Sequence, residues 1–267
     1  MTNSTLDTIT DAYRRPVTRG NPILDLNPIT MLLSLTFVTV VAVAVGGWVV
    51  PVMVSALFVV VGYAAGRGTT YLVTILKLWL VVGLLLFVLR ALLVEGEQVL
   101  IPLGPIAVTV EGILDGLEFA TVVMAICGAV TLFFTLVPMR HLTLALERLG
   151  VSPRASFVLL ASFQSITDLG ATARVVLDAQ KARGIETEGN ILVRAKAFFP
   201  ILAPVFLSAM SATEERAIAL DARAFNSPGA KTSLVQLRPT PAWEWVVVAV
   251  TLLAAVGAIV GGVLGWL

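Results

Sequence analysis

Cysteine and histidine are nearly absent from this chain of 267 residues, which contains one of each, Cys127 and His141. A single cysteine excludes an internal disulfide framework, and one cysteine with one histidine is too few for a zinc cluster. His141 lies beside Arg140 at the foot of an apolar segment, and we interpret it as a residue of the membrane interface. The sequence therefore predicts neither a metal site nor a bound cofactor.

Motifs of catalysis and nucleotide binding are missing as well. The pattern G-x-x-x-x-G-K-[ST], which cradles nucleotide phosphates, does not occur, nor do G-x-S-x-G and H-E-x-x-H. The apolar segments also lack the relay of buried carboxylates that a secondary transporter usually needs. The sequence therefore favours a non-catalytic scaffold driven by another protein over a membrane enzyme or a self-powered transporter.

Charged residues are scarce, at 13% of the chain, whereas soluble proteins contain about 25%. Uncharged runs cover residues 26–66, 119–139 and 245–267. The first run would form a helix of about 60 Å, twice the thickness of a bilayer's hydrocarbon core, so it must contain two spans. Gly46, Gly47 and Pro51 place the break between them. The predicted fold class is an all-α integral membrane protein.

About five transmembrane helices are predicted, at residues 28–45, 48–65, 69–94, 119–137 and 245–267. Lys77 and Arg90 in the third span are interpreted as charges that reach or pack near the interface. The acidic connection 95–118 is interpreted as a solvated outer loop. Residues 138–240 hold 12 of the 18 basic residues. Because inner loops are rich in Lys and Arg, we expect the N-terminus and residues 138–240 to be cytoplasmic and the C-terminus extracytoplasmic.

Three amphipathic cytoplasmic helices are predicted between spans four and five, at residues 139–149, 154–183 and 190–225. The third is uncharged over residues 197–213 and contains Pro200 and Pro204, so we interpret it as a bent interfacial helix and not as a sixth span. The expected organisation is a cytoplasmic segment (1–27), four spans (28–137), coupling helices (138–240) and a last span (241–267).

Two short runs within this region resemble each other and are 40 residues apart. Residues 179–184 read Ala-Gln-Lys-Ala-Arg-Gly and residues 219–224 read Ala-Leu-Asp-Ala-Arg-Ala, and each ends a helical pattern. Small residues near both ends let helices pack closely. An arginine at a helix end presents five donors in a planar fork to a docked protein, or it completes its own helix cap. The pattern alone does not decide whether the arginines dock to another protein or cap their own helices.

Several segments resemble the transmembrane T component of energy-coupling factor (ECF) transporters, the EcfT/CbiQ/BioN group. They are Leu-Asp-Leu-Asn-Pro-Ile-Thr (24–30), Pro-Met-Arg-His-Leu (138–142), Leu-Glu-Arg-Leu-Gly (146–150), 179–184 and 219–225. The resemblance implies that Ala182, Arg183, Gly184, Ala222, Arg223 and Ala224 contact two cytoplasmic ABC ATPase subunits. The sequence departs from the family pattern at Ala224, where glycine is favoured, and at Met31, where a basic residue is common.

The resemblance further implies a membrane-embedded S component that captures the substrate, a vitamin or a transition-metal ion. The expected partners are thus two ATPases, an S component and the lipid bilayer, with no nucleic acid, and the expected location is the cell membrane. Two alternatives stay open from the sequence: the permease subunit of a conventional ABC importer, and a secondary transporter. The sequence does not specify the substrate.

Overall fold

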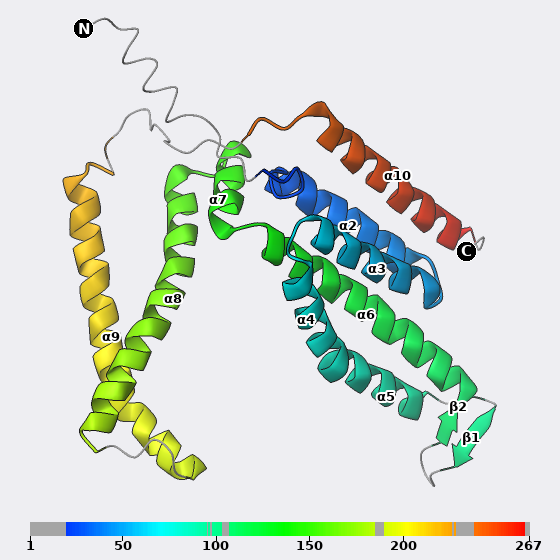
Figure 1. The fold of residues 1–267 in the computed structure, drawn as a ribbon, viewed down its shortest axis with the longest axis horizontal. Helices are drawn as coiled ribbons and strands as arrows, with labels where there is room; N and C mark the ends of the chain where they lie inside the picture. The colour runs from blue at the N-terminus through cyan, green and yellow to red at the C-terminus, as the bar shows by residue number, and fades with distance from the viewer. Residues whose placement is uncertain are drawn as a thin grey trace, which may run out of the picture. The chain divides into compact units, whose positions relative to one another are not determined.

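The computed structural model of this protein describes residues 20–94, 96, 98–102, 107–184, 190–225, 227 and 238–264. The regular secondary structure of these residues is helical except for one two-stranded sheet (Figure 1). The chain forms two compact units, Met1–Leu149 with Val235–Leu267, and Gly150–Leu234. We call them the membrane unit and the helix-pair unit, and each is described by itself.

The membrane unit begins its first helix at a strong local signal. The side chain of Asn27 accepts a hydrogen bond from the backbone N–H of Ile29, and Pro28 occupies the first helical position. The elements of this unit are α2 (Pro28–Ala44), α3 (Val49–Ala64), α4 (Gly68–Leu78), the π-helix η1 (Trp79–Gly83), α5 (Leu84–Leu93), β1 (Val99–Pro102), β2 (Ala107–Thr109), α6 (Val110–Leu136), α7 (Met139–Arg148) and α10 (Ala242–Val263).

Three described helices are long and apolar enough to cross a membrane: the continuous helix Gly68–Leu93, α6 and α10. The apolar helices α2 and α3 are shorter, with 17 and 16 residues. A helix of this length rises about 25 Å, slightly less than the hydrocarbon thickness. The predicted class, an all-α integral membrane protein, is confirmed.

Helix α6 is the central helix of the membrane unit. Its buried residues pack with residues of α2, α3 and α4 in one hydrophobic cluster, which includes Phe58, Tyr71, Met124 and Leu132, each at most 1% exposed. The Tyr71 hydroxyl donates a hydrogen bond to the Gly128 carbonyl at 3.3 Å. A side chain at Gly128 would meet that hydroxyl at 3.0 Å, so the glycine makes room for the buried ring.

The acidic connection differs from the prediction of a loop over residues 95–118. The structure begins α6 at Val110, and an antiparallel pair of strands, β1 and β2, precedes it. The Thr109 hydroxyl accepts a hydrogen bond from the Gly112 N–H. Glu111 lies in the first turn, where an acidic side chain interacts favourably with the helix dipole. Glu111, Asp115 and Glu118 are therefore helical residues, whereas Glu95 and Glu97 lie outside the described residues.

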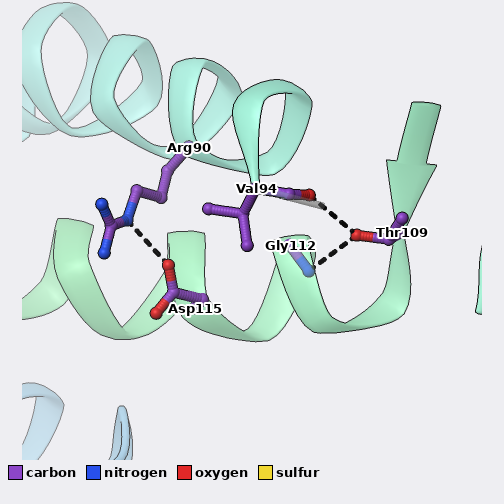
Figure 2. Close-up of polar contacts among 5 residues, drawn as sticks. All are labelled: Arg90, Val94, Thr109, Gly112 and Asp115. Carbon is purple, nitrogen blue, oxygen red and sulfur yellow. Dashed lines mark hydrogen bonds and ion pairs between the residues drawn. The ribbon is translucent and has the colours of Figure 1, made fainter. Parts of the chain in front are cut away.

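Arg90 is an exposed charge that pairs with an acidic residue which the sequence analysis placed in the loop. Its Nε donates to Asp115 Oδ2 at 2.7 Å, and its guanidinium lies 4.9 Å from the centre of the Phe119 ring. Figure 2 shows this pair and, separately from it at the start of α6, the Thr109 hydroxyl, which also donates to the Val94 carbonyl at 3.1 Å. These contacts join the end of α5 to the start of α6.

The described helices of the helix-pair unit are α8 (Pro153–Ala182) and α9 (Ile191–Ala222). Ser152 caps α8 by accepting a hydrogen bond from the Ala155 N–H, and Pro153 follows at the first helical position. Helix α9 is continuous through Pro200 and Pro204, and Figure 1 shows that its first part runs in a different direction from the rest. The predicted ends of both helices lie one residue from the observed ends, except for the end of α9. There the prediction extended to Phe225, three residues beyond the last helical residue.

Candidate protein-docking site

The two helices of the pair run antiparallel, as three contacts along their length show. Gln180, near the end of α8, donates to the Pro200 carbonyl in the first part of α9 at 3.3 Å. In the middle, Arg216 of α9 donates to the Ser165 hydroxyl of α8 at 3.0 Å. At the other end, the rings of Phe157 and Phe225 are 4.9 Å apart.

The contact between Gln180 and Pro200 has a cause in the sequence. Pro204 has no N–H, so the carbonyl of Pro200, four residues earlier, lacks its usual hydrogen-bond donor in the helix. The amide of Gln180, which is 8% exposed, fills this gap from α8. The proline that weakens α9 therefore creates the acceptor that holds the end of α8, two residues before Ala182.

Arg216 joins the helices near their middle. Its guanidinium lies 3.5 Å from Asp168 as well as donating to Ser165. Two crevices lie along the helix pair, with volumes of about 270 and 260 Å³, and Arg216 lines both of them. The second crevice is also lined by Phe157, Gln164 and Arg223. Arg223 therefore lies beside a space that a side chain of another protein could occupy.

The first predicted docking segment forms the C-terminal cap of α8. Ala182 is the last helical residue, and the N–H of Arg183 donates to the Gln180 carbonyl at 3.1 Å. The N–H of Gly184 donates to the Lys181 carbonyl at 2.9 Å, with φ at +84°. All three residues, Ala182, Arg183 and Gly184, are exposed.

The second segment caps α9 with the same two backbone hydrogen bonds. The N–H of Arg223 donates to the Leu220 carbonyl at 3.2 Å, and the N–H of Ala224 donates to the Asp221 carbonyl at 2.9 Å, with φ at +56°. The N–H of Phe225 donates to the Leu220 carbonyl at 3.0 Å and completes a Schellman motif. Ala222, Arg223 and Ala224 are exposed.

The shared cap gives the repeated sequence pattern a physical meaning. The third position of each segment adopts a left-handed conformation, which glycine adopts without strain and which alanine adopts at a cost because of its Cβ. Backbone N–H groups occupy carbonyls of the last turn in both helices. The arginine side chains are therefore not needed to bond those carbonyls.

The two arginines do not come together in space. Arg183 ends α8, and Arg223 ends α9 beside the start of α8, because the helices are antiparallel. Between Phe157 and Arg183, α8 rises about 40 Å, which estimates the separation of the two helix ends. The structure thus presents two like-built arginine ends far apart on one helical unit.

A buried carboxylate that the sequence analysis did not consider lies in the membrane unit. Glu244 is 2% exposed in the first turn of α10, and its Oε2 accepts hydrogen bonds from the Thr30 hydroxyl at 2.6 Å and the Asn27 N–H at 3.1 Å. The uncharged run that predicted the last span begins at residue 245, one position after Glu244. An acidic residue just before an apolar run suits a helix N-terminus, and that was the available signal.

The fold and the two helix ends define a class: a polytopic α-helical membrane protein with a separate helical unit that carries two matching arginine caps. The chain belongs to the CbiQ family, described as "Cobalt transport protein", whose model matches residues 19–234. The family resemblance predicted from the sequence is thereby confirmed.

Relatives are similar along most of the chain. The "Energy-coupling factor transporter transmembrane protein EcfT" of Thermosediminibacter oceani is 26% identical over 250 residues, which cover 90% of this chain and 94% of that protein. The protein of the same name from Listeria innocua is 32% identical over 199 residues, 71% of each chain. That from Bacillus subtilis is 28% identical over 194 residues, 67% of this chain and 70% of the relative.

Proposed function

We propose that this chain is the energy-coupling T component of an ECF-type importer, which links two cytoplasmic ABC ATPases to a substrate-binding S component in the membrane. The observation that carries the proposal is the pair of similarly capped arginine ends on one antiparallel helix pair. Family membership supports it, because the relatives are named as transmembrane proteins of such transporters. The chain itself is then a non-catalytic subunit, and ATP hydrolysis belongs to its partners.

Two like-built ends on one unit suit a dimer of ATPases, which offers two similar grooves. The segments Ala182-Arg183-Gly184 and Ala222-Arg223-Ala224 each present an exposed guanidinium next to a tight backbone turn. A guanidinium pairs well with carboxylates and with backbone carbonyls at a helix end. The proposed docking therefore places one arginine in the groove of each ATPase, with the helix-pair unit on the cytoplasmic side.

The helix-pair unit also offers an apolar surface for a partner in the membrane. Its described large apolar side chains are mostly exposed, among them Ile166, Phe198, Phe199, Phe206 and Leu207, each at least 57% exposed. Exposed apolar area of this extent marks contact with lipid or with another protein. We assign it to the bilayer interface and to the S component, whose substrate would be a vitamin or a transition-metal ion.

Charge reversal at both ends tests the docking. Co-expressed with its ATPases and purified in detergent, the double variant Arg183→Glu, Arg223→Glu should lose nearly all bound ATPase, because each change replaces a donor with a repelling carboxylate. Each single variant should weaken binding about ten- to a hundredfold, the range of losing one charged hydrogen bond. ATPase stoichiometry is read by native mass spectrometry.

The matched control is Arg174→Glu, which makes the same charge change at an exposed position in the middle of α8. It should leave the stoichiometry of the complex unchanged. Retention of stoichiometric ATPase by the double variant would contradict the proposed function. Equal loss in the control would show that net charge, and not the two helix ends, governs assembly.

A further inference from the structure

The helix-pair unit is inserted into the sequence of the membrane unit. The chain leaves the membrane unit and enters it again at positions that lie close together. The chain leaves at the end of α7, after Arg148 and Leu149, and is described again from Arg238, four residues before α10. Within the membrane unit, the Arg148 guanidinium donates to the Arg238 carbonyl at 3.2 Å. The outgoing and returning segments are thus joined by a hydrogen bond across 90 residues of sequence.

The returning chain then meets the buried carboxylate of Glu244. Oε2 of Glu244 accepts from the Thr30 hydroxyl and the Asn27 N–H, residues 214 and 217 positions away. The Thr30 hydroxyl is also 2.9 Å from the Asn27 carbonyl, so its one proton lies between two acceptors. These three residues join the first turn of α10 to the cap and first turn of α2, and we call them the α2–α10 anchor.

Helix α10 packs on α2 at its far end as well. A side chain at Gly262 would lie 3.0 Å from the Ala44 carbonyl, so the backbones approach closely where both helices end. The two helices therefore run parallel, with a polar anchor at one end and close backbone contact at the other, and Figure 1 shows them side by side.

A buried carboxylate is costly unless it is bonded, and residues of this kind in membrane helices usually have a function. Neither the proposed ATPase contacts nor the apolar docking surface uses Glu244. A plain transmembrane helix can tilt or shift in a bilayer at small cost. An α10 held only by apolar contacts would therefore shift when its N-terminus is pulled, whereas breaking the anchor leaves a buried polar group without partners.

We propose that the α2–α10 anchor holds α10 in a fixed position relative to α2. ATP-driven movement of the helix-pair unit, which is connected to α10 by the returning chain, then does not displace α10. Glu244 is on this proposal a positioning residue for energy coupling. The proposal rests on the proposed function. The movement instead takes place at Gly150, where the chain leaves α7: its φ is +98°, and no atom of the described residues lies within 4 Å of the position of a side chain.

The test uses spin-label distances in the complete complex in lipid nanodiscs, with and without Mg-ATP, in a Cys127→Ala background. One pair of labels, at Thr36 and Leu253, reports on α2 and α10; a second, at Thr36 and Ala171, reports on α2 and α8. All three positions are exposed. With an intact anchor, ATP should change the Thr36–Ala171 distance and leave the Thr36–Leu253 distribution unchanged.

The variant Thr30→Val, Glu244→Leu replaces the hydroxyl and the carboxylate together, so neither is left buried without the other. In this variant ATP should broaden the Thr36–Leu253 distribution about twofold and reduce the Thr36–Ala171 change by about half, since α10 then yields. The control is Thr39→Val, at a buried threonine on α2 whose hydroxyl donates to the Leu35 carbonyl within its own helix. It should behave as the wild type.

An unchanged Thr36–Leu253 distribution in the variant would overturn the anchor, as would an equal ATP response of this pair in the wild type. Absence of any ATP-dependent Thr36–Ala171 change in the wild type would also overturn it. If the ATPases bind in these preparations, the proposed function stands while the anchor falls. If they do not bind the wild type, the proposed function has failed.

Discussion

Ala224 adopts a left-handed conformation, with φ at +56°, at the position that Gly184 occupies in the other cap, with φ at +84°. For an L-residue with a Cβ this conformation costs roughly 1–2 kcal/mol. The deviation of the second segment from the family pattern, an alanine in place of glycine, is therefore accommodated with strain and without loss of the cap.

Ala224→Gly should stabilise the end of α9 by about 1 kcal/mol, because glycine removes this strain. The amides of Ala224 and Phe225, which donate to carbonyls of the last turn, should then exchange hydrogen about fivefold more slowly. Hydrogen exchange followed by mass spectrometry measures the effect. Gly184→Ala is the reverse change in the matching cap and should speed exchange there; faster exchange after Ala224→Gly would contradict the assignment.

At the scale of elements, glycine sets how closely α5 approaches α6. A side chain at Gly116 would lie 3.0 Å from the Phe87 carbonyl and 3.3 Å from the Ala91 nitrogen, and one at Gly112 would lie 3.0 Å from the Ala91 carbonyl. Gly112 and Gly116 are four residues apart on α6, the spacing that lets membrane helices pack closely. The Arg90–Asp115 pair then joins the same two helices.

Gly116→Ala should destabilise the membrane unit by about 1–3 kcal/mol, because the atoms it meets belong to the backbone of α5 and cannot turn aside. Denaturation in mixed micelles measures the change. Gly257→Ala on α10 is the control, since in the part of the chain that the structure describes nothing lies within 4 Å of its added carbon. That variant should be neutral or slightly more stable, as alanine favours a helix. Equal effects at the two sites would show that helix contact does not matter here.

The helix pair illustrates how a sequence signal acquires its meaning only in the fold. Pro200 and Pro204 predicted a bent helix, and α9 does change direction. The sequence did not indicate that Gln180 donates to the carbonyl which Pro204 leaves unpaired. The same holds for Phe157 and Phe225, whose contact depends on the antiparallel pairing of two helices.

At the scale of the whole molecule, the distribution of basic residues predicts how the chain is oriented in the bilayer. Single-cysteine variants in a Cys127→Ala background test this prediction at two exposed turns, Gly46 and Arg67. A membrane-impermeant maleimide should label Gly46→Cys on intact cells and Arg67→Cys only after permeabilisation, because the Arg67 turn is expected to be cytoplasmic. Labelling in the opposite order would invert the topology and place the arginine ends away from cytoplasmic ATPases.

Much of the fold was determined by the sequence alone, because it depends on local features. Uncharged runs defined the apolar helices, and Pro153 and Gly184 lie at the start and just past the end of α8. The family was also accessible from short motifs. The sequence analysis placed the start of α6 too late, because it assigned the acidic residues 111, 115 and 118 to a loop. The helix cap at Thr109, nearer the true start, was not recognised.

Only the tertiary structure decided which distant groups meet. The bonds of Glu244 with Thr30 and of Arg148 with Arg238 span 214 and 90 residues of sequence, and no local pattern specifies them. They form because packed helices bring polar groups together where water is excluded and each must find a partner. The sequence therefore determined that two arginines end two helices, and the antiparallel packing of α8 and α9 decided that these ends point to separate places.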